Sequence, residues 1–154
     1  MKPTAYTQIQ IQIVFAVKFR QALIHSSWEE KLHKYITGIV QNHRHKLLAI
    51  NGMPDHIHIV IGYRPHQALS DLVRDIKKGS TNYVNEMKFC PFKFQWQEGY
   101  GAFSYSNDEI KNVIAYVHDQ KEHHRKKSFI EEYVKMLREF NVEYVPEYLL
   151  RDPQ

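Results

Sequence analysis

Hydrophobic and polar residues alternate along the first patterned segment of the chain, from Thr7 to Val17. A period of two residues is typical of a strand with one buried face. A second pattern follows Ser26 and Ser27, either of which can cap a helix. Its apolar residues recur every three to four positions, namely Trp28, Leu32, Tyr35, Ile36, Ile39 and Val40. The first forty residues therefore predict a strand followed by an amphipathic helix.

A hairpin is predicted next. The segment from Lys46 to Ile50 has the pattern of a short strand, and the isoleucine-rich segment from His56 to Tyr63 has that of another. Asn51-Gly52 between them is a tight-turn signal, and Pro54 ends the turn. Two strands at this spacing are expected to be antiparallel neighbours.

The second half of the chain predicts a helix and a fourth strand. Ser70 can cap a helix that continues toward Met87, although Gly79 weakens its middle. The aromatic stretch from Phe89 to Phe103 is interpreted as a strand broken by a loop, since Gly99 and Gly101 interrupt it.

Two more helices complete the chain. Asn107 can cap one that runs at least to Gln120, and Ser128 can cap a last helix through Phe140, with a tail to Gln154. The order β-α-β-β-α-β is that of the ferredoxin-like split arrangement, an α+β fold with an antiparallel sheet whose helices cover one face. The other face of the sheet must be covered by other elements or must serve as a functional surface. We expect a single domain over 1–154, with a core of about 7–127 and a helix and tail over 128–154.

Length and composition limit the classes of protein to consider. A chain of 154 residues favours one domain, and 43% hydrophobic residues are typical of a globular protein. The single cysteine, Cys90, cannot form an internal disulfide, which favours a reducing cytoplasmic compartment. No apolar run approaches the ~20 residues of a membrane span, and the N-terminus lacks the pattern of a signal peptide. We therefore expect no membrane association.

Positive charge is concentrated in the middle of the chain, although the net charge is only +4. Six Lys and Arg residues oppose three acids from Arg64 to Lys93, and five oppose two from Lys111 to Lys127. The segment after Lys127 is acidic. This distribution suits a polyanionic partner, but an ordinary solvated surface explains it as well.

Two histidines are the first candidates for chemistry. His56 and His58 lie two apart on a predicted strand, so they point to one face while Ile57 and Ile59 point to the other. Two imidazoles on a rigid strand can supply half of a metal site. As an isolated motif, such a pair is more often two ordinary hydrogen-bonded histidines.

Tyr116 and Gln120 are the second candidates, because a spacing of four residues places them one turn apart on the same helix face. By itself such a tyrosine is more often an amphipathic packing residue. A third group combines cations and rings that could bind a single nucleic-acid strand through phosphate contacts and base stacking. Its members are Lys77, Lys78, Ser80, Lys93, Tyr100 and Arg125. Core packing and surface lysines explain part of this group.

Four motifs together resemble one family. The segment from Asn51 to Ile61, with His56-Ile57-His58, resembles the His-hydrophobic-His segment of the small single-tyrosine HUH transposases of bacterial insertion sequences. So do Leu69–Ser80, Trp96–Ser104 and the Tyr-x-x-x-Gln pattern that Tyr116 and Gln120 form. The transposases associated with repetitive extragenic palindromes are close relatives, and Gln120 favours the insertion-sequence type.

This resemblance implies a function. His56, His58 and Gln120 would ligate Mg²⁺ or Mn²⁺, and Tyr116 would attack single-stranded DNA. The products would be a 5′-phosphotyrosine and a free 3′-OH, which a second strand could rejoin. The family also implies a homodimer, hairpin DNA at element ends, no small-molecule cofactor, and a location with the nucleoid in the bacterial or archaeal cytoplasm.

Other functions remain compatible with the residues. A non-catalytic or host-adopted relative that binds a single nucleic-acid strand would need neither a metal nor Tyr116. A metal-dependent or two-histidine phosphodiesterase that acts on small molecules is another alternative. The two-histidine type is disfavoured, because such enzymes carry a His-x-Thr/Ser pair twice and this chain has His-Ile-His once.

Overall fold

A four-stranded antiparallel sheet forms the centre of the computed structural model, which describes residues 4–123 and 127–149. The strands lie in the order β2-β3-β1-β4. Their bounds are Gln10–Ala16 for β1, Lys46–Met53 for β2, His56–Gly62 for β3 and Gly101–Tyr105 for β4. With one α-helix between β1 and β2 and another between β3 and β4, this is the ferredoxin-like arrangement, and the predicted fold class is confirmed.

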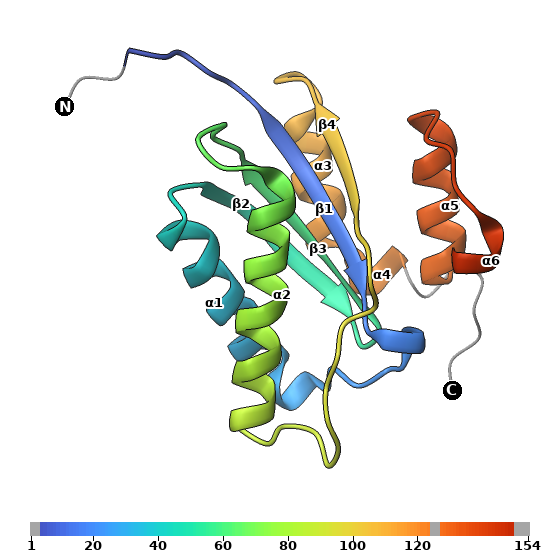
Figure 1. The fold of residues 1–154 in the computed structure, drawn as a ribbon. Coiled ribbons are helices and arrows are strands. Elements are labelled where there is room, and N and C mark those ends of the chain that lie inside the picture. The colour runs from blue at the N-terminus through green and yellow to red at the C-terminus, as the bar shows by residue number, and fades with distance from the viewer. Residues whose placement is uncertain (1–3, 124–126, 150–154) are drawn as a thin grey trace.

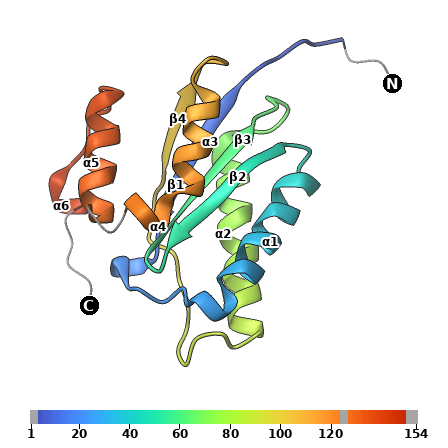
Figure 2. The ribbon, with the colours of Figure 1, turned by 180° about the vertical axis from the view of Figure 1, so that it is seen from behind.

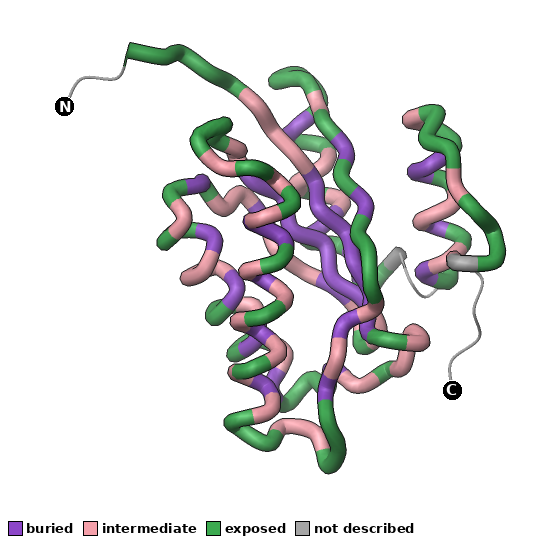
Figure 3. Tube along the Cα trace, viewed as in Figure 1, coloured by how far each residue is buried: buried purple, intermediate pink, exposed green. Residues whose placement is uncertain are grey.

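Helices α1 (Ser26–Asn42) and α2 (Leu69–Glu86) cover one face of the sheet (Figure 1). Because strand side chains alternate, the odd-numbered residues of β1 and β3 enter this side. They form the larger core with α1 and α2, and the fully buried members include Ile13, Leu32, Ile36, Ile57, Ile59, Ile61, Leu72 and Ile76. Figure 3 shows this buried material along the central strands.

Helices α3 (Ile110–His118) and α4 (Gln120–His123) lie over the opposite face, as Figure 2 shows from behind, and side chains of α5 (Phe129–Glu139), which stands beside β4 in that view, pack against the same face. Helix α3 packs through Ile110 and Val117 against Ala49 and Val60. Helix α5 forms a second cluster with β1 and β4, made of Val14, Ala16, Phe103, Phe129, Met136 and Leu137. Two short helices, η1 (Lys18–Arg20) and α6 (Pro146–Leu149), complete the described chain. None of the helices described is long and apolar enough to cross a membrane.

The hairpin is longer than predicted, and its turn lies elsewhere. Strand β2 continues through Asn51 and Gly52 to Met53, so that Pro54 and Asp55 make the turn. Gly52 pairs with Ile57, and a Cβ at Gly52 would lie 2.3 Å from the carbonyl oxygen of His56. The glycine is therefore required by the close approach of two strands, and the predicted Asn51-Gly52 turn was wrong.

Helix caps also differ from the predictions. The N-cap of α1 is His25, whose Nδ1 accepts from the backbone N–H of Ser27, and both candidate serines lie inside the helix. Helix α2 starts after Ala68 without a side-chain cap, so Ser70 does not cap it. Only Ser128 caps as predicted, accepting from the backbone N–H of Glu131. Backbone geometry at each entry decided between neighbouring polar residues, which the sequence could not do.

The third interpretation to be corrected concerns β4 and the helix after it. Only Gly101–Tyr105 belongs to the fourth strand, while Trp96 forms an isolated bridge with Val17 and the rest of 89–100 is irregular. Asn107 lies in a turn before α3, whose N-cap is Glu109. The predicted continuous helix to Gln120 is broken at Asp119, so Tyr116 and Gln120 lie on two consecutive helices.

Candidate metal and nucleophile site

Strand β3 presents His56 and His58 to the face covered by α3, α4 and α5, where both side chains are fully buried. Their ring centroids lie 5.1 Å apart. Ile57 and Ile59 enter the opposite core, as the alternation of the sequence predicted. The two-residue period thus separates two imidazoles from an apolar core within one strand.

A hydrogen-bond acceptor orients each imidazole. The Nδ1 of His56 lies 2.7 Å from Oδ1 of Asp55, and that of His58 lies 2.6 Å from Oε1 of Gln12. A carboxylate or an amide oxygen can only accept, so Nδ1 is the donor in both rings. Each ring then presents its Nε2 to the space between the histidines and α5. Phe129 stacks on His56 with centroids 4.3 Å apart, which further restrains that ring.

Glu132 of α5 completes the cluster and was not among the predicted site residues. Its Oε1 lies 2.8 Å from Nε2 of His58 and 3.7 Å from Nε2 of His56. The side chain is only 3% exposed, and ligand atoms of the three residues lie within 4.8 Å of one another. The sequence did contain a signal: Glu132 occupies the apolar stripe of α5, three residues after Phe129 and four before Met136. A charged residue in a helix's buried stripe requires a partner.

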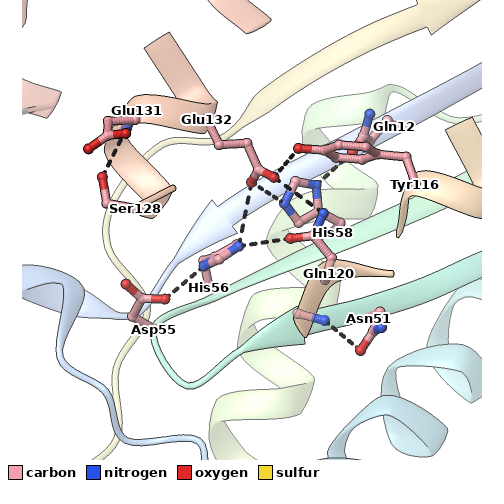
Figure 4. A network of polar contacts seen from close by, with 11 residues as sticks. Gln12, Asn51, Asp55, His56, His58, Tyr116, Gln120, Ser128, Glu131 and Glu132 are labelled. Carbon is pink, nitrogen blue, oxygen red and sulfur yellow. Dashed lines mark hydrogen bonds and ion pairs between the residues drawn. The ribbon is translucent and has the colours of Figure 1, made fainter. Parts of the chain in front are cut away.

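Gln120 and Tyr116 both reach this carboxylate, although their helix is broken between them. Gln120 is fully buried, with its Oε1 3.4 Å from Nε2 of His56 and its Nε2 donating to Oε2 of Glu132 at 3.3 Å. The hydroxyl of Tyr116 donates to the same Oε2. Figure 4 shows the side chains converging from β3, α3, α4 and α5 of one chain. Burial and the adjacent Glu132 carboxylate raise the pKa of Tyr116 well above its ordinary value, which keeps the phenol protonated.

The donors fit a divalent cation. Because Nδ1 carries the proton in both rings, a neutral His58 directs the lone pair of its Nε2 at the Glu132 carboxylate, 2.8 Å away. Two acceptors at this distance repel unless a proton or a metal ion lies between them. Two imidazoles, one carboxylate and one amide oxygen together form a donor set that can bind a divalent metal ion. The hydrogen bonds to Nδ1 are the contacts that commonly orient metal-binding histidines.

The predicted DNA-binding residues that the structure describes lie on the other side of the molecule, around α2 and the segment before β4. A cavity of about 1330 Å³ there has Lys77, Lys78 and Tyr100 among its lining residues, together with Lys18 and Arg74. Lys78, Lys93 and Tyr100 are exposed. Arg125 lies outside the described residues. The structure therefore brings three of the six predicted DNA-binding residues to one groove.

Two members of the predicted DNA-binding set have structural partners. The Nζ of Lys77 donates to the carbonyls of Gln97 and Gly99, and burial lowers the pKa of Lys77 to about 8. Ser80 is fully buried, and its hydroxyl donates to the carbonyl of Ile76 while accepting from Nε1 of Trp96 at 2.9 Å. Ser80 therefore holds Trp96 in place and offers no exposed atom to a DNA backbone.

Comparisons with known proteins show which family and which folds this chain resembles. The family described as "Transposase IS200 like" has a sequence model that matches residues 5–120. The ISDra2 transposase TnpA of Deinococcus radiodurans is 25% identical over 73 residues, which are 47% of this chain and 52% of that protein. The chain thus spans about half the length of this curated relative.

Two solved structures show the same fold. A putative transposase from Deinococcus radiodurans superposes with a TM-score of 0.62 at 18% identity, over 78% of this chain and 96% of the other. A transposase associated with repetitive extragenic palindromes, solved bound to a hairpin of such a repeat, gives a TM-score of 0.60 at 16% identity. That match covers 80% of this chain and 74% of the other.

Proposed function

The chain belongs to the family of IS200-like transposases, and from this premise we propose that it cuts and rejoins single-stranded DNA with Tyr116 as the nucleophile. One observation carries the proposal. Five side chains form one connected group on the face of the sheet covered by α3, α4 and α5, namely Tyr116, Glu132, His58, His56 and Gln120. A nucleophile beside a potential metal site is the arrangement that phosphoryl transfer requires, since it depends mainly on positioning and charge stabilisation.

His56, His58, Gln120 and Glu132 would hold the metal ion, Mg²⁺ or Mn²⁺. When bound, the ion supplies charge stabilisation to the scissile phosphate. The first three ligands are neutral and follow from the resemblance, whereas Glu132 is added because its Oε1 lies 2.8 Å from Nε2 of His58. One carboxylate among three neutral ligands leaves the ion with net positive charge toward the phosphate.

The reaction balances with the side chains present. The phenolic oxygen of Tyr116 forms a bond to phosphorus, and the bond from phosphorus to the 3′-oxygen breaks. The electron pair leaves with that oxygen, which takes up a proton to become a 3′-OH. The phenolic proton has the carboxylate of Glu132 as its hydrogen-bond acceptor. Attack by a second strand's 3′-OH on the 5′-phosphotyrosine reverses these steps and joins DNA.

The DNA partner is proposed to be a single strand that carries hairpins. The groove beside α2 supports this, because Lys18, Arg74 and Lys78 can contact phosphates while Tyr100 offers a ring for stacking. The structurally similar transposase bound to a repeat hairpin supports the same class of partner. We propose that the protein is located where this DNA is, in the cytoplasm at the nucleoid. As in the family it resembles, it is proposed to act as a homodimer.

Covalent capture tests the proposal. The protein is mixed with single-stranded DNA from the flanks of its gene, with Mn²⁺ or with chelator, and run on a denaturing gel. We expect a metal-dependent protein–DNA adduct that Tyr116→Phe abolishes. Tyr35→Phe is the matched control, because Tyr35 stacks on Tyr83 on the opposite face of the sheet. Strand binding without an adduct or a nick would instead establish the non-catalytic binding relative.

A further inference from the structure

A second cavity, of about 490 Å³, lies between α3 and α5. Tyr116 and Glu132 are among its lining residues, so it adjoins the proposed nucleophile directly. It is distinct from the groove beside α2, because the two cavities share no lining residue. The volume is near the lower end of the roughly 300–1,000 Å³ range of small-molecule pockets, which suits one nucleotide and not a duplex.

The lining combines flat or apolar walls with a few polar groups. Val113 and Met136 come from the two helices, and Tyr105 from the end of β4. The ring of Tyr105 is fixed by an edge contact with Phe140, at 5.4 Å between centroids. Such walls bind the face of a nucleobase with little sequence preference.

The polar groups are placed for the rest of a nucleotide. The hydroxyl of Tyr105 accepts from Nε2 of Gln12 at 2.8 Å and keeps its own hydrogen for a base edge. Burial raises the pKa of Tyr105 to about 12, so this hydrogen is present at neutral pH. Asn112 adds an exposed amide, and Lys127 and Lys135 add positive charge suited to phosphates. Lys135 also lies 3.9 Å from Glu139, which limits its charge only in part because both are exposed.

We propose that this pocket binds one unpaired nucleotide of the DNA strand, the one immediately 3′ of the cleaved bond. The proposal rests on the function proposed above. In an in-line displacement the leaving 3′-oxygen lies opposite the attacking oxygen. The nucleotide on the 3′ side is held to phosphorus by its 5′-oxygen, in an equatorial position, and it stays attached to Tyr116 through the phosphate after the 3′-oxygen has left. Asn112, Val113 and Tyr116 of the tyrosine's own helix line the pocket, so the retained nucleotide is its natural occupant.

Abasic substitution tests this assignment once capture has located the cleaved bond. Removing the base 3′ of that bond is expected to reduce adduct formation by roughly 5- to 150-fold, the effect of losing one stacked base. Removing the base on the 5′ side should have a much smaller effect. Val113→Phe, which fills the pocket, should lower capture of the intact strand and remove the difference between intact and abasic strands. Ala115→Phe, exposed on the same helix, is the control.

A measurement without chemistry accompanies it, since Val113→Phe could disturb folding. The non-nucleophilic Tyr116→Phe protein is bound to strands that carry 2-aminopurine at successive positions. One position should become protected from acrylamide quenching, and Val113→Phe in the same background should remove that protection. An adduct with no abasic effect and no protected position would overturn the pocket while leaving the transferase intact. A protected position without an adduct supports the pocket and rejects the transferase, and absence of any binding rejects both.

Discussion

On one face of the sheet, Ile57, Ile59 and Ile61 of β3 enter a continuous apolar core with α1 and α2. On the other face, His56 and His58 of the same strand meet a carboxylate. The apolar contacts there are divided into two smaller clusters on either side of the histidines. Both faces are buried, so burial alone does not separate stability from function. The difference lies in the groups that are buried. The first face buries apolar side chains that need no further partner, whereas the second buries polar groups whose charges balance only with a proton or a cation.

Adjacent residues of β3 offer the strongest contrast between the faces. His58→Ala removes a proposed metal ligand, and we expect it to abolish the metal-dependent adduct in the capture assay. Ile59→Val, one residue along on the other face, should leave adduct formation near the wild-type level. A His58→Ala protein that still forms the adduct at the wild-type rate would contradict the proposed site.

The free energy of unfolding should show the opposite contrast, with the larger dependence on the apolar face that holds Ile59. Ile59 is fully buried in the larger core, and Ile59→Ala is expected to lower the free energy of unfolding by about 2–5 kcal/mol through lost transfer energy and the cavity left behind. Urea denaturation measures the change, and Ile59→Val, at about 0.5–1.5 kcal/mol, calibrates it. A loss below 1 kcal/mol for Ile59→Ala would mean that the core around β3 collapses onto the gap.

A bound metal ion should stabilise the folded protein through contacts on the histidine face alone. A cation that binds only the folded chain adds about 2.7 kcal/mol to the free energy of unfolding at 100 times its dissociation constant. We therefore expect Mn²⁺ to raise the melting temperature of the wild type. Glu132→Gln should reduce this shift at the same Mn²⁺ concentration, because an amide is the weaker ligand. An equal shift in both proteins would place the metal away from Glu132.

Ser80 tests a contact on the apolar side that was expected to bind DNA. Ser80→Ala leaves the buried Nε1 of Trp96 without its acceptor, which should cost about 1–3 kcal/mol in urea denaturation. Asn82→Ala, exposed on the same helix, should cost less than about 0.5 kcal/mol. In DNA-binding titrations against salt, Ser80→Ala should leave the slope unchanged, whereas Lys78→Ala lowers it by about one counterion. A reduced slope for Ser80→Ala would restore its DNA contact.

The last prediction concerns Lys77, whose Nζ lies 5.2 Å from the centroid of the Phe15 ring. Burial lowers its pKa from 10.5 to about 8. Between these values the unfolded chain binds more protons, so this lysine makes the free energy of unfolding rise with pH, while below pH 8 its effect is constant. Urea midpoints from pH 7 to 10 should show that Lys77→Met lacks this rise. The difference between the two proteins isolates Lys77 from Cys90, whose burial-raised pKa has the opposite effect. Parallel profiles would refute the prediction.

Much of the fold could be predicted because it depends on local periodicity. Alternation along β1 and β3 and the three-to-four spacing of α1 and α2 were sufficient for the strand and helix order, and hence for the ferredoxin-like class. Caps and turns were less predictable. Gly52 illustrates why, because its role in β2 depends on the carbonyl of His56 in a neighbouring strand.

The features of the site also divide into those that follow from local sequence patterns and those that depend on tertiary packing. That His56 and His58 share one face, opposite Ile57 and Ile59, follows from the two-residue period of a strand and was correct from the sequence. Tyr116 reaches those histidines through Glu132, and Gln120 contacts both His56 and Glu132. Both arrangements depend on how α3, α4 and α5 fold back over the sheet. Glu132 is 74 residues from His58 along the chain and contacts it at 2.8 Å. A short-range pattern carries no information on such a separation, so only the packing of α5 could bring the carboxylate to the histidines.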